Sequence, residues 1–146
     1  MSFDYIDVHK LVKCVEHKKN LDAKYIKLKD WLVESCETSE LSPGAFIFDK
    51  NTEGCLTLKL PVYKIELIFE DSFVIINDAP LLKLVATKRD GDKEEDIIIF
   101  YLAKNGLFYI NEYEPNPSYD YDDSSLFIKI LDATLKALKS KNKISL

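Results

Sequence analysis

Apolar residues in the first part of the chain recur at the three- and four-residue spacing of an α-helix. The first stripe comprises Val8, Leu11, Val12 and Val15, and the second comprises Leu21, Tyr25, Leu28 and Leu32. This periodicity predicts amphipathic helices over residues 4–37. Asn20 is able to end one helix and Asp22 to support the start of the next, so we expect two N-terminal helices.

After Ser42-Pro43-Gly44 the period of the apolar pattern changes to two, which is typical of β-strands. The predicted strands cover residues 45–49, 55–60, 63–69, 73–76, 81–88, 97–102 and 107–110. Every connection between them is too short to hold a crossover helix, so neighbouring strands should run antiparallel. We therefore expect an antiparallel meander of about seven strands.

Three local features refine this sheet. The polar group Glu70-Asp71-Ser72 predicts a turn between the third and fourth strands. The near-continuous apolar run from Ile97 to Leu102 indicates a central strand covered on both faces. Asn105-Gly106 predicts a tight hairpin, because both residues tolerate positive φ.

The last element is a helix predicted over Ser124 to Ser140. Its apolar side is formed by Phe127, Ile130, Leu131, Leu135 and Leu138. Beyond Lys141 we expect a frayed tail. The chain shows no internal repeat and no linker-like stretch, which favours a single α+β domain over residues 1–146 with the helices packed on the sheet.

Composition agrees with a folded chain. Hydrophobic residues make up 47% and charged residues 31% of 146 residues, an ordinary globular balance that suits one core. The first residues lack the basic and apolar regions of a signal peptide, and the run from Ile97 to Ala103 is too short to cross a bilayer. Cys14, Cys36 and Cys55 have no pairing or zinc-type spacing, so we expect small buried thiols, a reducing compartment and a cytoplasmic location.

Negative charge is concentrated in one part of the chain. The net charge is −5, and residues 89–124 alone carry ten acidic and three basic side chains. A nucleic-acid backbone is therefore excluded as the partner of this part, whereas a basic protein is favoured.

The usual signatures of catalysis are missing from the sequence. The two histidines, His9 and His17, are eight residues apart on one predicted helix, too far apart to share a metal ion or a substrate. No glycine-rich phosphate loop and no His-Glu-x-x-His pair occurs. The carboxylate-rich segment from Asp90 to Asp96 lacks the glycine and glutamate of a calcium loop. We expect no catalytic residue, no cofactor and no metal, with a metal-dependent hydrolase using Asp90, Asp92 and Asp96 as a less favoured alternative.

Residues 109–123 stand out as a candidate binding surface, because they hold four of the eight tyrosines together with two prolines and several carboxylates. Tyrosine recurs in the energetically dominant parts of interfaces, and carboxylates attract a basic partner. The predicted contacts are Tyr109, Glu112, Tyr113, Glu114, Tyr119, Asp120, Tyr121 and Asp122, joined by Asp90, Asp92, Glu94 and Glu95 of the segment from Asp90 to Asp96. The alternative is that the tyrosines pack on the sheet and the acids only solvate a connection.

The pattern as a whole favours a protein-binding inhibitor that is a monomer or a homodimer. Our first hypothesis is an immunity protein, which would cover the basic active site of a nuclease-type bacterial toxin with the tyrosine-rich acidic surface. The alternatives are a secretion or effector chaperone that uses apolar grooves, and a phage-encoded inhibitor that mimics nucleic acid.

Overall fold

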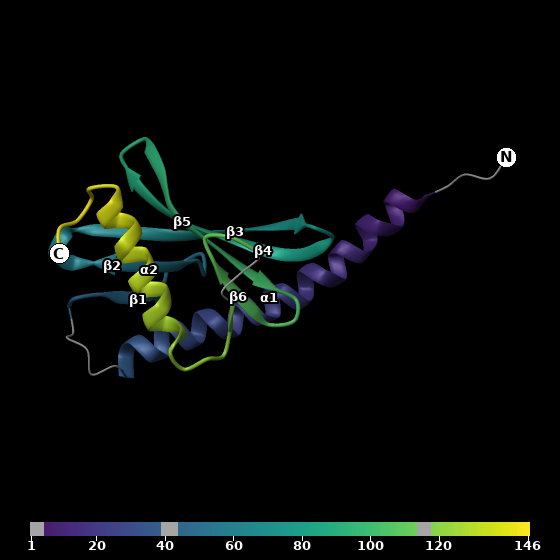
Figure 1. Ribbon diagram of the computed structural model, residues 1–146, viewed down its shortest axis with the longest axis horizontal. Helices are drawn as coiled ribbons and strands as arrows, with labels where there is room; N and C mark the ends of the chain where they lie inside the picture. The colour runs from purple at the N-terminus through teal and green to yellow at the C-terminus, as the bar shows by residue number, and fades with distance from the viewer. Residues whose placement is uncertain (1–4, 39–43, 114–117) are drawn as a thin grey trace.

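The computed structural model describes residues 5–38, 44–113 and 118–146 and shows an α+β fold (Figure 1). Seven strands form one curled antiparallel sheet in sequence order, β1-β2-β3-β4-β5-β6-β7. The helices are α1 (Ile6–Thr38) and α2 (Leu126–Ser140), and the strands are β1 (Ile47–Lys50), β2 (Leu56–Leu60), β3 (Ile65–Ile76), β4 (Ala79–Asp90), β5 (Lys93–Ala103), β6 (Leu107–Ile110) and β7 (Ser118–Asp120), with a 3₁₀ turn, η1 (Pro61–Tyr63). The expected antiparallel meander is confirmed. No helix of the described residues is long and apolar enough to span a membrane.

The N-terminal region is one continuous helix of 33 residues, so the prediction of two helices was wrong. Asn20 and Asp22 do not cap anything here. Lys24 donates a hydrogen bond to Asn20, and Lys18 donates one to Asp22, both across one helical turn. Such pairs support a helix interior, and no glycine or proline occurs between residues 6 and 38 to end it.

Strand β3 is also longer than expected, because the turn predicted at residues 70–72 does not form. Ser72 lies in mid-strand opposite Lys83 of β4. The chain reverses instead at Asn77 and Asp78, whose φ values of 50° and 63° identify a two-residue turn of type I′. Residues 73–76 are therefore part of β3 and not a separate strand. The seventh strand is instead β7, which lies outside all predicted strands.

A β-bulge explains the apolar run in β5. Ala86 of β4 pairs with Ile98 and Thr87 pairs with Asp96, so Ile97 is the extra residue. Ile97 and Ile98 consequently both belong to the main core. The run had been interpreted as a strand covered on both faces, but the bulge turns two successive residues to the same side. The hairpin that follows is confirmed at residues 104–106, with Gly106 alone in the left-handed region, at φ 88°.

Both helices pack on the same face of the sheet. The main core joins Leu21, Tyr25, Leu28 and Leu32 of α1 with Leu126, Ile130 and Leu138 of α2 and with alternate strand residues such as Leu82 and Leu84. A smaller cluster around Leu81, Ala103 and Tyr109 lies on the opposite face, because neighbouring strand residues point to opposite sides. The second face is thus partly apolar, and neither of the two helices in the described part of the chain lies over it.

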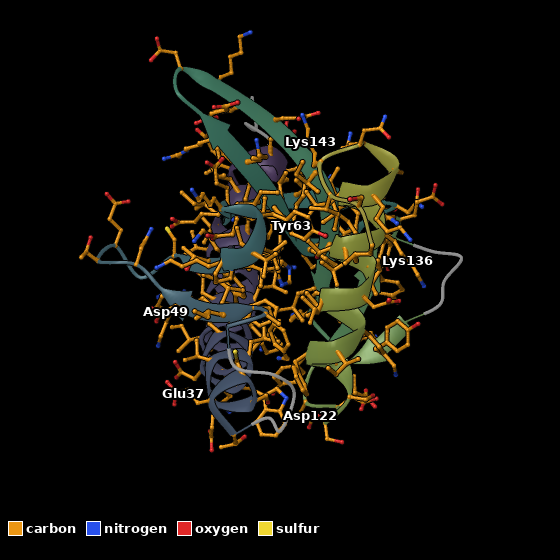
Figure 2. The ribbon with its side chains drawn as sticks, turned by 90° about the vertical axis from the view of Figure 1, so that its left-hand side faces the viewer. Glu37, Asp49, Tyr63, Asp122, Lys136 and Lys143 are labelled. Atoms are coloured by element: carbon orange, nitrogen blue, oxygen red, sulfur yellow. The ribbon has the colours of Figure 1, made fainter. Side chains whose placement is uncertain are left out.

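The C-terminal tail is packed and not frayed. Ile144 is buried in the main core, Lys143 forms an ion pair with Glu95 at 2.9 Å, and the Tyr63 hydroxyl donates a hydrogen bond to the carbonyl of Ser145. In Figure 2, Asp122 lies at the start of α2 and Lys143 beyond its end. The tail therefore ties the end of α2 to the β4-β5 hairpin.

Candidate partner-binding surfaces

The two acidic segments selected from the sequence lie at opposite ends of α2. Asp120 and Asp122 directly precede the helix, whereas Glu95 contacts Lys143, three residues after the helix ends. A helix of 15 residues is about 22 Å long at 1.5 Å per residue. The structure therefore does not bring the predicted contacts into one continuous surface.

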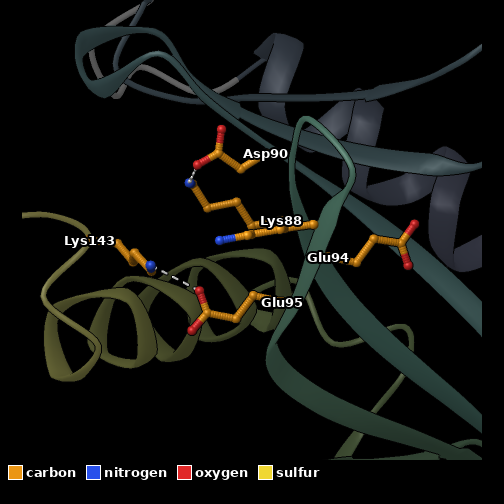
Figure 3. A pocket seen from close by; sticks show the side chains of 6 residues that line it. Lys88, Asp90, Glu94, Glu95 and Lys143 are labelled. Atoms are coloured by element: carbon orange, nitrogen blue, oxygen red, sulfur yellow. Dashed lines mark ion pairs between the residues drawn. The ribbon is translucent and has the colours of Figure 1, made fainter.

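At the β4-β5 hairpin three of the predicted carboxylates are paired with basic side chains. Lys88 lies 4.0 Å from Asp90, Lys143 lies 2.9 Å from Glu95 and Arg89 lies 3.0 Å from Glu94. Figure 3 shows Asp90 and Glu95 turned toward the two lysines, with Glu94 on the other side of the hairpin. The cavity of about 360 Å³ at this place is lined by Lys88, Asp90, Lys93, Glu94, Glu95 and Lys143. It is therefore of mixed charge and not a purely acidic field.

These ion pairs affect the titration of two groups. The hydrogen bond from Lys143 lowers the pKa of Glu95 below its ordinary value. The hydrogen bond with Glu70, followed by the charge of Glu94, raises the pKa of Arg89. Both effects favour the charged forms. Asp92 lies exposed at the tip of the hairpin, and no group of three or more potential metal ligands occurs in the described part of the chain.

Tyr109 is not a surface residue. Only 5% of it is exposed, and its ring packs edge to face against Tyr113 with the ring centres 4.8 Å apart. Both belong to the small cluster on the second face of the sheet. Tyr109 thus stabilises the fold in this conformation and is not positioned for a partner contact. Glu112, beside this cluster, is exposed, and Glu114 lies outside the described residues.

The remaining predicted contacts form a compact group, residues 119–122, which we call the acidic turn. Tyr119 and Tyr121 are half-buried and pack against the main core. Lys129 lies 4.2 Å from the centre of the Tyr119 ring, and a methyl group at Gly106 would come within 3.1 Å of the Tyr121 ring. Asp120 and Asp122 are exposed. The tyrosines are therefore partly structural, as in the alternative that the sequence left open, while the two carboxylates face solvent.

The carboxylate next to the acidic turn has a different role. Asp123 accepts hydrogen bonds of 2.8 Å from both the backbone N–H and the hydroxyl of Ser125. The backbone bond is the main cause of its lowered pKa, with Lys129 contributing. Asp123 therefore binds the chain at the entry to α2, next to the exposed carboxylates of Asp120 and Asp122.

The two histidines do not form a common site. His17 Nδ1 lies 3.0 Å from the Nζ atom of Lys104, and because the lysine ammonium can only donate, this nitrogen accepts. His9 is exposed two turns earlier on α1. The three cysteines are free and half-buried, so they are less buried than the sequence predicted.

The stripe of Val8, Leu11, Val12 and Val15 is evident from the sequence, whereas its exposure is a property of the fold. These side chains are 56%, 68%, 59% and 53% exposed. Around the helix the centre of this stripe lies about 120° away from the stripe of Leu21 to Leu32, which enters the core. The phase difference was visible in the sequence, because Val15 and Leu21 are six residues apart and so cannot share a face. We call this exposed set the N-terminal stripe.

No protein-family model, no curated protein and no solved structure matches this chain.

Proposed function

We propose that this protein acts by binding another protein, and that it is an inhibitor of the immunity type which neutralises a basic, nuclease-type toxin. The observation that supports this proposal is the acidic turn. Asp120 and Asp122 project into solvent beside two half-exposed tyrosine rings, and among the described residues neither carboxylate takes part in an ion pair. A basic partner would supply the missing counter-charges.

The proposed contact is smaller than the sequence suggested. It comprises Tyr119, Asp120, Tyr121 and Asp122, with Glu112 on the other side of the β6-β7 connection. Asp90, Glu94 and Glu95 of the hairpin are not included, because Lys88, Arg89 and Lys143 already pair with them. Asp92 is not included because the β4-β5 hairpin and the acidic turn lie at opposite ends of α2. The proposal includes a cytoplasmic, reducing setting, which suits the three free thiols.

The test begins with the tagged protein expressed in its own host and the identification of basic proteins that co-purify at low but not at high ionic strength. The affinity of the purified complex is then measured by calorimetry for the wild type and for a D120N/D122N variant. We expect a loss of at least tenfold, because two unpaired charges are removed from the contact.

The matched control is E37Q/E53Q, which removes two exposed carboxylates from α1 and from the β1-β2 turn. It should bind like the wild type and protect cells equally well against the partner. The test replaces Asp120 and Asp122 by asparagine and leaves Tyr119 and Tyr121 unchanged. Both tyrosine rings pack on the core, so alanine at either position would disturb the fold. Equal affinity of both double variants would show that the acidic turn is not the contact.

A secretion or effector chaperone is the second candidate, and an apolar cavity favours it. The cavity, of about 220 Å³, lies beside α2 and is lined by Ala45, Phe46, Leu60, Val62, Tyr63, Leu131, Leu135 and Leu146. Val62 is 77% exposed at its rim. Apolar side chains of an extended segment would fit such a site. In this case binding would be insensitive to salt, and V62D would abolish it while D120N/D122N would not.

A further inference from the structure

A surface helix usually turns its apolar face to the core and its polar face to solvent. The first half of α1 has the reverse orientation. Its polar face, with Lys10, Lys13 and His17, lines a cavity of about 210 Å³ against the β3-β4 hairpin. Its apolar face, the N-terminal stripe, points away from the protein, and the first turns of α1 extend beyond the sheet (Figure 1). Burial starts only at Leu21. An apolar face on an extended helix is the arrangement of an interaction surface.

We propose that a second copy of this chain covers the N-terminal stripe, so that the first halves of two α1 helices pair in antiparallel orientation. The spacing is that of a coiled-coil seam. Tyr5, Val8, Val12 and Val15 alternate at intervals of three and four residues, which is the heptad pattern of positions that face a partner helix. Tyr5 is 58% exposed and extends the stripe by one layer.

The seam has a defined end. The next two residues in the same series are Lys19 and Asp22, which would place charged side chains into an apolar contact. In a parallel pair in register, these residues would meet their own copies and repel one another. An antiparallel pair avoids this problem, because the apolar layers can pair among themselves while residues 19 and 22 stay outside.

One antiparallel register satisfies every apolar position. It places Val8 opposite Val12 of the second copy and Tyr5 opposite Val15, with Leu11 next to Leu11 of the second copy at the two-fold axis. The residue numbers of the facing Val8–Val12 and Tyr5–Val15 pairs add up to 20, so the two-fold axis lies beside residue 10 and the two Leu11 side chains flank it. The overlap is confined to residues 5–15 of each copy, whereas the buried part of α1 starts at Leu21. The two sheet domains therefore lie at opposite ends of the helix pair.

The side chains beside the seam meet their own copies in this register. In an antiparallel pair a flank of one helix meets the same flank of the partner helix. Leu11 lies on one flank of the stripe and His9 on the other, so His9 lies closest to His9 of the second copy beside the two-fold axis. The contact is thus isologous, as a two-fold dimer requires.

The area of the contact predicts a reversible dimer. Each of the five apolar side chains exposes roughly 100 Å², so two copies would bury on the order of 1,000 Å² in total, the lower limit for a specific interface. The dimer should therefore dissociate on dilution. It does not depend on the acidic turn, which lies on another element, so the two proposals succeed or fail separately.

Sedimentation equilibrium over a series of concentrations tests this inference. The wild type should change from monomer to dimer as the concentration rises. L11E, which places two like charges at the two-fold axis, should weaken the dimer at least tenfold. The control is I26E on the same helix, where Ile26 is 56% exposed but outside the proposed overlap, and its association should equal that of the wild type. Circular dichroism checks that both variants remain folded.

A second experiment tests the register. H9E brings two glutamates together beside the two-fold axis and should weaken the dimer, whereas H9Q adds no charge and should associate like the wild type. A protein that stays monomeric at all concentrations would overturn the inference, whatever else the N-terminal stripe binds. Equal weakening by L11E and I26E, or equal association of H9E and H9Q, would overturn it as well.

Discussion

The two halves of α1 carry apolar stripes of the same spacing in opposite environments. In the second half Leu28 is 1% exposed, whereas in the first half Leu11 is 68% exposed. Both stripes belong to one uninterrupted helix, so neither helix propensity nor periodicity distinguishes them. The difference arises from what the sheet can reach. A helical stripe shows that a face is suited to be covered, and only the tertiary structure shows whether this chain covers it.

The two halves of α1 should differ most in how much a truncated side chain lowers the free energy of unfolding. L28A should lower the free energy of unfolding by about 2–5 kcal/mol, because it leaves a cavity in the main core. The same change at Leu11 should alter the stability of the monomer by less than about 0.5 kcal/mol, since it removes atoms that already contact solvent. Urea unfolding of dilute protein measures both. Similar losses for the two variants would mean that the stripes do not differ as described.

A second difference concerns Tyr25, a polar side chain in the buried half. Its hydroxyl is buried and has no hydrogen-bond partner among the described residues, and burial raises its pKa. The unfolded chain ionises this group near pH 10. The folded chain retains the proton, so stability is fully present below pH 10 and is lost as the pH rises further, by up to about 1.4 kcal/mol per pH unit.

Y25F should therefore remove part of this alkaline destabilisation while changing stability little at pH 7. The measurement is urea unfolding of the wild type and of Y25F from pH 8 to 11. The other tyrosines are the same in both proteins, so their titration cancels in the difference between the two free energies of unfolding. As a control, Y5F changes an exposed tyrosine directly before the same helix and should follow the wild type. Parallel pH profiles for wild type and Y25F would contradict the buried, protonated state of this hydroxyl.

The smallest expected effect lies at the junction of the two halves. Lys18 and Asp22 form an exposed ion pair of 2.7 Å across one helical turn, and the hydrogen bond to Asp22 raises the pKa of Lys18. K18M should cost about 0.3–0.5 kcal/mol, and the cost should disappear at high salt. K27M, at an exposed lysine of the same helix, gives the reference. A salt-independent loss would indicate packing and not charge.

Local sequence patterns determined the elements of the fold. Alternation, short connections and turn residues predicted an antiparallel meander and the C-terminal helix, and both are present. The errors occurred where one signal has two meanings. Polar residues 70–72 resembled a turn but lie on the solvent side or edge of a long strand, and Asn20 resembled a cap but pairs within the helix. Local preferences of this size are readily overridden by pairing along a full strand or helix.

The candidate site depended more on tertiary structure than the fold did. The sequence identified acidic and tyrosine-rich segments, yet only the packing showed that Tyr109 is buried and that Asp90, Glu94 and Glu95 pair with Lys88, Arg89 and Lys143. Lys88 and Arg89 belong to the same hairpin as their partners, and their pairing depends on its register. Lys143 approaches Glu95 from beyond α2, and this contact cannot be obtained from spacing along the sequence.

The sequence by itself determined which residues are apolar, which are charged and at what period each recurs, because these properties act through neighbours within a few positions. The tertiary structure decided which face of α1 meets the sheet, which carboxylates find a counter-charge and which remain in solvent. Those outcomes depend on contacts between residues far apart in the chain, such as Glu95 with Lys143, and a local pattern contains no information about such contacts.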